Sequence, residues 1–534
     1  MERGYALRGA KQEHDIRLVT AYLRAADSLP FRFNAAEWFI GRHVREGRAS
    51  SIAIIDDEGS ITYGQLDDAV RRFANVLRDA GARHDERIVF IAPDSRWLSI
   101  GFWGAIASGA VAVPVNTLLK PADFQYVIDD CGARIAVVDP RIVDPSEIVS
   151  VDAEMWTIDE MRKRIEGASP RGMYTQTHRD AMAFLLYSSG TTGEPKGVVH
   201  LHHDMWICCE TYGKTVLEIG PEDRCFSVAK LFFAYGLGNA QYFPFHVAGT
   251  AVLFAGRPVP AAVFDVVRNH RPTLFFGVPT AYANMLAAMD DGIAADFSSV
   301  RTCISAGEAL PAAILERWRA RTGVDILDGI GSTEICHIFL SNRHGDIRPG
   351  SSGKAVDGYE LKIVSESGDS VPTGEFGDLI VRGDSTMALY WNKHEATKSA
   401  MSGEWIRTGD KYAQDADGFY VHGGRSDDMI KAGGIWVSPV EVEAALVRHP
   451  SVVECAVIAV ADDDGLHKPH AVVVLRSGVS PGDAVASELR EFVKKSLAPY
   501  KCPRTIRFVD ELPKTATGKV KRYVLRKMTA SEGD

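Results

Sequence analysis

Unbroken apolar runs rich in valine and isoleucine alternate with helix-like stretches through the first half of the chain. The clearest runs lie at 87–92, 109–113, 134–138, 250–254 and 273–276. Strands that helices cover on both faces carry such continuous runs, whereas half-exposed strands alternate apolar and polar positions. The pattern therefore predicts layered α/β structure from Phe31 to about Gly256.

The most membrane-like stretch, residues 97–115, is interrupted by glycines, serines and Pro114. A membrane-spanning helix needs about 20 steadily apolar residues. We therefore expect a buried helix that runs into a strand, and no membrane segment. Residues 1–30 carry charges throughout and have no apolar signal core, so they are interpreted as a polar N-terminal extension.

The pattern changes after residue 360. Strand-like runs separated by turns predict antiparallel hairpins over 360–382, which would form a small β-barrel-like part. After Gly423 and Gly424, the pattern predicts a separate α+β domain with four elements: a helix at 441–447, strands at 454–460 and 469–475, and a helix at 484–497. The expected organisation is an extension (1–30), a large layered α/β domain (31–424) and a small, mobile C-terminal domain (425–534).

Composition narrows the class of protein. A chain of 534 residues is longer than the roughly 250–300 residues that one hydrophobic core supports, so at least two domains are expected. The formal net charge of −10 argues against a nucleic-acid partner, because nucleic-acid-binding surfaces are basic. The eight cysteines include no Cys-x-x-Cys pair, which indicates reduced, mostly buried thiols and a cytoplasmic location.

The strongest candidate site is the run YSSGTTGEPKG at 187–197, with apolar residues on both sides. A strand–loop–strand element is expected there. Glycines let backbone N–H groups approach a phosphate, hydroxyl groups donate hydrogen bonds, and Lys196 supplies a charge. A polar hairpin turn is the alternative. The run is not a Walker A loop, because Pro195 and Gly197 stand where that pattern needs glycine and Ser or Thr.

Six segments in this order resemble the motifs of the adenylate-forming superfamily, which includes acyl-CoA synthetases, luciferases and the adenylation domains of peptide synthetases. They are 187–197, SAGEAL (305–310), DGIGSTE (328–334), WIRTGD (405–410), GRSDDMIK (424–431) and PKTATGK (513–519). The resemblance covers roughly residues 30–530. It implies an ATP-dependent enzyme with an N-terminal AMP-binding domain and a mobile C-terminal catalytic domain.

The resemblance also implies the nucleotide site. The expected ATP- and AMP-binding residues are Ser188, Ser189, Gly190, Thr191, Thr192, Gly193, Lys196, Ala306, Gly307, Glu308, Asp328, Gly329, Ile330, Gly331, Ser332, Thr333, Asp410 and Arg425. The expected catalytic residues are Lys519, Thr333, Glu334 and Lys196. Glu334 would hold Mg²⁺ through a hard oxygen, and the Asp410 carboxylate suits a ribose diol. A turn cap for Asp410 and a solvated charge for Lys519 are the alternatives.

By the same resemblance, the C-terminal domain rotates about a hinge at Asp427 between two half-reactions. Lys519 would close the site for adenylation and then leave, which opens a tunnel for a thiol. The expected contacts for coenzyme A are Gly433, Gly434, Trp436, Lys501 and Arg504. A simple turn at the two glycines and a solvated surface at the two basic residues are the alternatives.

The segments KLFFAYGLGN (230–239) and EICHIFLSN (334–342) resemble the benzoate-CoA ligase branch. The expected acid-binding residues are Phe233, Ala234, Tyr235, Gly236, Gly331, His337 and Ile338. Their large members would form a short slot that favours a flat ring over a long acyl chain. His337 is either a hydrogen-bonded core histidine or a pocket wall. Cys336 stands where a larger apolar residue is expected, and its small side chain could widen the pocket.

The sequence thus predicts an aryl-CoA ligase. ATP would activate benzoate or a substituted benzoate as aryl-AMP, with Mg²⁺ as cofactor and CoA as co-substrate; a homodimer is left open. One alternative is the same chemistry on a different carboxylic acid or toward a carrier-protein thiol. Another is an inactive regulator on this fold, against which the presence of Lys196, Glu334, Asp410 and Lys519 argues.

Overall fold

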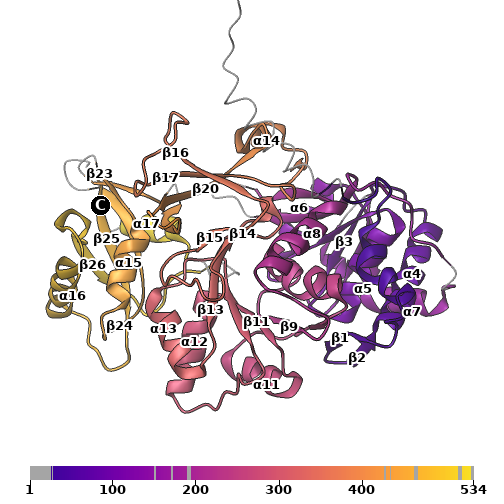
Figure 1. Ribbon diagram of the computed structural model, residues 1–534, viewed down its shortest axis with the longest axis horizontal. Helices are drawn as coiled ribbons and strands as arrows, with labels where there is room; N and C mark the ends of the chain where they lie inside the picture. Colours follow the sequence, from indigo (N-terminus) through magenta and orange to yellow (C-terminus); the bar gives the residue numbers. More distant parts are fainter. Residues whose placement is uncertain are drawn as a thin grey trace, which may run out of the picture.

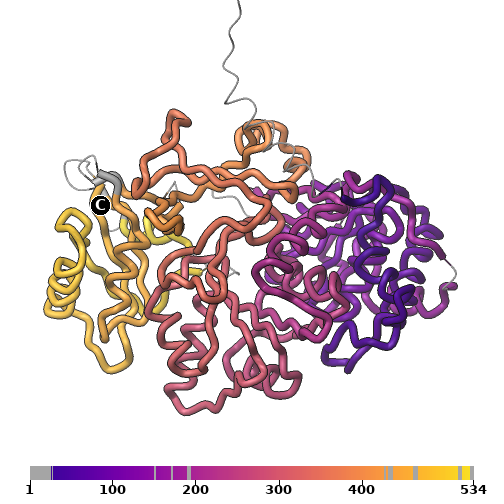
Figure 2. Tube along the Cα trace, in the orientation of Figure 1, coloured from indigo at the N-terminus to yellow at the C-terminus, as the bar shows by residue number. Residues whose placement is uncertain are grey.

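The computed structural model describes residues 26, 28–149, 152–169, 172–188, 194–425, 428–432, 435–461, 467–514 and 520–530. The predicted α/β class is confirmed, with a large N-terminal part of two mixed sheets, an antiparallel sheet and a small C-terminal α+β unit. The chain runs from one end of the long axis to the other, with the C-terminal unit in yellow at the left of Figures 1 and 2.

A seven-stranded sheet has the order β18-β8-β7-β4-β3-β5-β6. Its strands are β3 (Arg87–Ile91), β4 (Val111–Pro114), β5 (Ala133–Val138), β6 (Glu154–Thr157), β7 (Met182–Ser188), β8 (Lys196–Leu201) and β18 (Leu389–Tyr390). Its helices are α4 (Tyr63–Asp79), α5 (Arg96–Ser108), α6 (Pro121–Cys131) and α7 (Ile158–Gly167). Ile88 and Phe90 pack in one core cluster with α4 and α5, and Val89 and Ile91 pack in another with α6. Both faces of β3 are therefore buried, as its unbroken apolar run predicted.

The stretch 97–115 is α5 followed by β4, as expected. Ser95 caps the start of α5 by accepting from the Leu98 N–H, and Gly109 ends it with a φ of 88°. A left-handed residue of this kind favours glycine, which explains where the helix stops. No helix within the described ranges has the length and apolar character that crossing a bilayer requires. All eight cysteines are free thiols, and all but Cys455 are buried.

A nine-stranded sheet has the order β15-β14-β13-β12-β11-β9-β10-β1-β2. Its strands are β1 (Ile52–Asp56), β2 (Gly59–Thr62), β9 (Arg224–Ser227), β10 (Thr250–Val252), β11 (Leu274–Gly277), β12 (Thr302–Ser305), β13 (Ile326–Gly331), β14 (Ile338–Ser341) and β15 (Lys354–Ala355). Helices α11 (Pro260–His270), α12 (Pro279–Asp290) and α13 (Ala312–Thr322) pack on one face in a common core cluster (Figure 1). Strands β9, β11, β12 and β13 are parallel, so their carboxyl ends share one edge.

Short helices fill the space between the two large sheets. They are η1 (Glu37–Gly41), α3 (Arg42–Arg45), α8 (His202–Cys208), η3 (Cys209–Gly213), α9 (Ala234–Leu237), η4 (Gly238–Tyr242) and α10 (Phe243–Val247). Phe39, Met205, Tyr242 and Phe245 from these elements lie in the same core cluster as Phe90 of β3. One continuous core therefore joins the two sheets.

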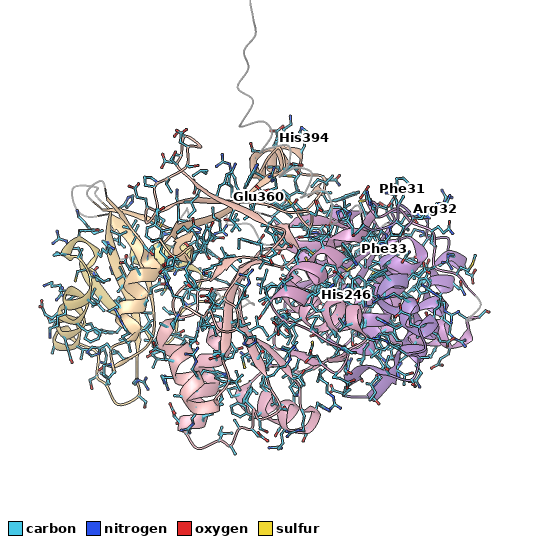
Figure 3. All side chains as sticks on the ribbon, viewed as in Figure 1. Phe31, Arg32, Phe33, His246, Glu360 and His394 are labelled. Carbon is cyan, nitrogen blue, oxygen red and sulfur yellow. The ribbon has the colours of Figure 1, made fainter. Side chains whose placement is uncertain are left out.

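A five-stranded antiparallel sheet follows, which agrees with the hairpins predicted over 360–382. It contains β16 (Glu360–Val364), β17 (Gly377–Arg382), β19 (Met401–Ser402), β20 (Trp405–Gln414) and β21 (Tyr420–Arg425), with α14 (His394–Ala400) beside it. Figure 3 labels Glu360 and His394, the first residues of β16 and α14, along the upper side of the molecule.

The C-terminal unit has hydrophobic core clusters of its own. It contains β22 (Ile430–Ala432), β23 (Ile435–Val437), α15 (Pro439–Val447), β24 (Val452–Ala461), β25 (His467–Leu475), α16 (Asp483–Ser496), β26 (Thr505–Phe508) and α17 (Arg522–Ala530), with the short η6 (Pro499–Lys501). The four elements expected from the sequence here correspond to α15, β24, β25 and α16. Most of the N-terminal extension, 1–30, lies outside the described residues.

Candidate active site

The phosphate-binding candidate is built on the hairpin of β7 and β8. Ser188 pairs with Lys196 in the last rung before the loop, as the predicted strand–loop–strand element requires. Lys196 is half-buried, and its Nζ lies 5.2 Å from the centre of the Tyr390 ring. Of the expected loop residues, Ser189, Gly190, Thr191, Thr192 and Gly193 lie outside the described residues.

The expected adenine and acid segments meet at the shared carboxyl edge of the nine-stranded sheet. Ser305 of β12 pairs with Asp328 of β13, and Ser227 of β9 precedes the segment 230–236. Ligands of open α/β sheets bind at this edge, because the loops that follow parallel strands converge there. The residues expected at this edge are Ala306, Gly307, Glu308, Gly329, Ile330, Gly331 and Ser332.

Glycine is required at three of these positions. Gly307 has a φ of 93°, a left-handed conformation that other residues rarely adopt. A Cβ on Gly331 would lie 2.5 Å from the His337 carbonyl oxygen, and one on Gly329 would lie 2.7 Å from that of Leu340. The backbone of β13 can therefore approach β14 closely. Asp328 directly precedes Gly329 in β13, and burial raises the pKa of its carboxyl well above the usual value.

Thr333 and Glu334 lie in the 3₁₀ turn η5 (Thr333–Ile335), which is held from both sides. The His200 Nε2 atom donates to the Thr333 carbonyl at 2.7 Å, and its Nδ1 lies 2.7 Å from the buried Asp204 carboxylate. On the other side, the Tyr390 hydroxyl donates to Glu334 Oε1 at 2.9 Å. The turn is thereby fixed relative to β8 and the phosphate hairpin.

The chemistry of these residues fits a Mg²⁺ ion that arrives with a nucleotide. Glu334 is half-buried, and Tyr390 is the hydrogen-bond donor to its carboxylate among the described residues. No cluster of three or more acidic, histidine or cysteine side chains suited to a metal occurs in the described ranges. Mg²⁺ is commonly held by one or two carboxylates together with substrate phosphates, so a single glutamate suffices.

Asp410 on β20 faces the last residues of β21. Arg425 Nη1 lies 3.2 Å from Asp410 Oδ1 and also donates to the Thr408 carbonyl at 3.2 Å, while His422 Nε2 lies 3.6 Å from the same carboxylate. The two expected nucleotide contacts, Asp410 and Arg425, are thus neighbours. Asp427, the expected hinge, lies outside the described residues.

The acid-binding candidate surrounds His337. Four aromatic rings, those of Tyr212, Tyr235, Tyr242 and Phe243, have centroids 4.5 to 6.1 Å from its own. Burial lowers the pKa of His337 to about 3, so the ring is neutral at ordinary pH. Phe233 and Tyr235 are half-buried, whereas Ala234, Gly236 and Ile338 are buried.

The segment 230–236 is anchored by the buried Asp94 and the half-buried Lys230. The Leu231 N–H donates to Asp94 at 3.0 Å, and the Lys230 ammonium donates to the carbonyls of Phe254 and, at 2.9 Å, of Gly256. Burial raises the pKa of Asp94 to about 6, although the Lys230 charge opposes that rise. A Cβ on Gly236 would lie 2.1 Å from the Lys230 carbonyl oxygen, so the segment folds tightly on itself.

The expected CoA contacts are only partly described. Gly433, Gly434 and the catalytic candidate Lys519 lie outside the described residues, and Trp436 is described by its backbone alone. Lys501 donates to both carboxylate oxygens of Glu441 at 2.7 Å. Arg504 accepts a hydrogen bond from Arg490 at its carbonyl, and its side chain is exposed.

Arg522 of the C-terminal unit lies in a strongly acidic environment. Arg522 of α17 donates to Glu443 at 2.7 and 2.9 Å and lies 3.7 Å from Asp428. Burial lowers the pKa of Arg522, but the negative charges of Glu443, Asp428 and Glu308 outweigh burial and raise the pKa above its usual value. Glu308 belongs to the expected adenine segment, so the charge of Arg522 is influenced from both the C-terminal unit and that segment.

Sequence reasoning did not find Tyr390, Asp94 or Asp204, and it gave no role to Lys230. It also gave none to Asn239, whose Oδ1 lies 3.1 Å from His337 Nε2. Tyr390 lies 56 positions from Glu334, and Asp94 lies 137 from Leu231. The only signal for Lys230 was its place at the start of an unusual aromatic segment.

Comparisons with known proteins agree with this geometry. The family model for AMP-binding enzymes matches residues 42–391, and that for the AMP-binding enzyme C-terminal domain matches 441–519. Benzoate–CoA ligase of Thauera aromatica is 46% identical over 512 residues, which cover 94% of this chain and 97% of that protein.

Two solved structures are also similar. The anthranilate CoA ligase AuaEII in complex with anthranoyl-AMP has a TM-score of 0.90 and 41% identity, with 95% of this chain and 99% of that chain covered. A benzoate CoA ligase from Burkholderia xenovorans LB400 has a TM-score of 0.86 and 45% identity, with coverage of 92% and 100%. The chain belongs to the AMP-binding enzyme family. Its predicted resemblance to the benzoate-CoA ligase branch of adenylate-forming enzymes is confirmed.

Proposed function

We propose that this protein is an aryl-CoA ligase, which activates benzoate or a simple ring-substituted benzoate with ATP and transfers the acyl group to CoA. The observation that carries the proposal is the aromatic enclosure of neutral His337, two positions after the η5 turn that holds Glu334. A short slot with aromatic walls favours a flat ring over a long, flexible chain. Similarity to enzymes named for benzoate and anthranilate supports the same substrate class.

Adenylation needs positioning more than proton transfer. A benzoate carboxylate is ionised at pH 7, so it can attack the α-phosphorus without a general base. The new P–O bond gives aryl-AMP, and the bond to pyrophosphate breaks. Lys196 and the backbone near Gly307 would hold the phosphates and the adenine side, and Asp410 would accept hydrogen bonds from the ribose. Mg²⁺, held by Glu334 and the phosphates, would supply positive charge to the pyrophosphate that leaves.

Thioester formation completes the reaction. The CoA sulfur attacks the aryl carbonyl, the C–O bond to AMP breaks, and the thiol proton is released to solvent. Lys519 would serve the first half-reaction, and the residues at 433, 434 and 436 would line the thiol path in the second. Because Lys501 is paired with Glu441, we expect Arg504 to contribute more than Lys501 to CoA phosphate binding.

Trapping of the intermediate tests the proposal. Protein, ATP, Mg²⁺ and benzoate without CoA should yield enzyme-bound benzoyl-AMP after an acid quench, in stoichiometric amount by mass spectrometry. Addition of CoA should convert it into benzoyl-CoA. Conversion only by a phosphopantetheine-bearing carrier protein would favour the carrier alternative. Failure to form benzoyl-AMP or any ring-substituted aryl-AMP would contradict the proposal.

A further inference from the structure

We propose that Tyr390 is a positioning residue for the nucleotide phosphates and their divalent cation, because it contacts the Glu334 carboxylate and the Lys196 ammonium group at once. This inference rests on the proposed function and adds a residue to that same site. Tyr390 would act through Glu334 and Lys196 rather than on the reacting atoms.

The side chain of Tyr390 makes a different contact with each charge. Its hydroxyl donates to Glu334 Oε1 at 2.9 Å, while the Lys196 Nζ lies 5.2 Å from the centre of its ring. Tyr390 is only 8% exposed and its two partners are half-buried, so water has limited access to both contacts. A cation near an aromatic face and a hydrogen bond to a carboxylate are both strengthened when water is excluded.

The backbone places Tyr390 independently of its hydroxyl. In β18, Tyr390 pairs with Val198 of β8, and the N–H of Trp391 donates to the Gly197 carbonyl at 2.7 Å. On the other side, the N–H of Met387 donates to the Glu334 carbonyl at 2.7 Å. The segment 387–391 therefore ties the phosphate hairpin to the η5 turn through main-chain bonds, and loss of the hydroxyl should not displace the ring.

The division of contacts has a physical consequence. The hydroxyl engages Oε1 of Glu334 and so fixes the direction of the second oxygen, which would face the cation. The ring holds the Lys196 ammonium group beside the expected cation position, where the phosphates would also lie. Loss of the hydroxyl should weaken cation binding, and loss of the ring should also weaken phosphate binding.

Equilibrium binding separates these two effects without any turnover. The probe is Mn²⁺ with α,β-methylene-ATP, which cannot transfer its AMP group to an acid because its α–β bridge is not cleaved, and free Mn²⁺ is followed by electron paramagnetic resonance. Tyr390→Phe should weaken Mn²⁺ binding in the presence of the analogue about tenfold, the usual consequence of losing one hydrogen bond to a charged group. Its affinity for the analogue in EDTA should stay within about twofold of wild type, because the ring remains. Tyr390→Leu should also lower the affinity for the analogue in EDTA, because the ring is lost.

Tyr174→Phe is the matched control. It removes a hydrogen bond of the same kind, from the Tyr174 hydroxyl to Asp67 at 2.6 Å, away from the candidate site. Unchanged Mn²⁺ affinity in Tyr390→Phe would overturn the inference, as would an equal loss of analogue affinity with and without Mn²⁺. If wild type bound neither the analogue nor Mn²⁺ with it, the proposed function itself would fail. If instead the wild type binds the analogue and Mn²⁺, and Tyr390→Phe binds them equally well, only the inference about Tyr390 fails.

Discussion

The Nε2 atom of His337 lies 3.1 Å from Oδ1 of Asn239, an acceptor toward which that nitrogen can donate when it carries the ring proton. The same nitrogen also faces the Tyr235 carbonyl at 3.2 Å. Nδ1 is buried and has no hydrogen-bond partner among the described residues. One nitrogen of His337 is therefore satisfied in the core, as the core-histidine alternative from the sequence expects, while its role as a pocket wall stays a prediction.

Replacing His337 should weaken binding of the carboxylic acid without weakening binding of ATP. His337→Phe keeps an aromatic ring but leaves Asn239 Oδ1 and the Tyr235 carbonyl without that donor, which costs about 1–3 kcal/mol for buried groups. Because Tyr235 is an expected wall of the acid slot, the KM for benzoate should rise about tenfold or more while the KM for ATP changes little. Steady-state kinetics with each substrate varied in turn checks this; an equal rise in both constants would contradict it.

Acid should destabilise the protein through buried neutral histidines. Burial lowers the pKa of His202 to about 3, from an ordinary value near 6.5. Between these pH values the unfolded chain binds a proton that the folded chain does not, so the free energy of unfolding falls as pH falls. The slope is about 1.4 kcal/mol per pH unit for one such proton.

His202→Asn tests that linkage. The amide oxygen can replace Nδ1 as acceptor for the Ala35 N–H, which lies 3.1 Å away in the wild type. Chemical denaturation between pH 4 and pH 6 should show a shallower pH dependence for the variant, by about one proton. Parallel curves for the two proteins would mean that His202 does not carry this linkage.

Asp410→Asn should weaken ATP binding. The amide preserves the shape of the side chain but loses the charge that would accept from the ribose hydroxyls, so a roughly tenfold rise in the KM for ATP is expected. Asp415→Asn is the control, because it removes a carboxylate paired with Arg348 just beyond the end of β20. The hypothesis fails if both variants behave alike, or if the KM for benzoate rises as much as that for ATP.

Lys519→Ala should separate the two half-reactions. The sequence places this residue in adenylation, so single-turnover formation of aryl-AMP should fall by a factor of about a hundred or more, as expected when a charged transition-state contact is lost. Conversion of supplied aryl-AMP and CoA into aryl-CoA should change much less. Rapid-quench assays of each step measure both rates. Equal losses would contradict domain alternation.

Much of the fold could be predicted because it depends on local patterns. The apolar run 87–92 and the helical patterns beside it in the sequence are enough to predict a buried strand. In the structure, β3 is buried on both faces. The predicted segments 305–310 and 328–334 likewise follow or include neighbouring parallel strands, β12 and β13, which share a carboxyl edge.

Contacts between distant segments could not be predicted in this way. Tyr390 reaches Glu334 only because β18 pairs with β8, and nothing within its own segment indicates that pairing. Cys336 is a second example. It has a φ of 71° in a tight turn closed by a 2.9 Å bond from the His337 N–H to the Ile335 carbonyl, and its sulfur lies 3.7 Å from the Tyr242 hydroxyl. A change of size at Cys336 would therefore act on this packing as well as on the slot.

The most direct test of the proposed function is pyrophosphate release with ATP and Mg²⁺ across aromatic, alicyclic and short fatty acids, with and without CoA. We expect the highest kcat/KM for benzoate or a simple ring-substituted benzoate, with sustained turnover only when CoA is present. Turnover on aliphatic acids alone would be consistent with adenylation but would contradict the predicted aromatic slot at His337 and Tyr235.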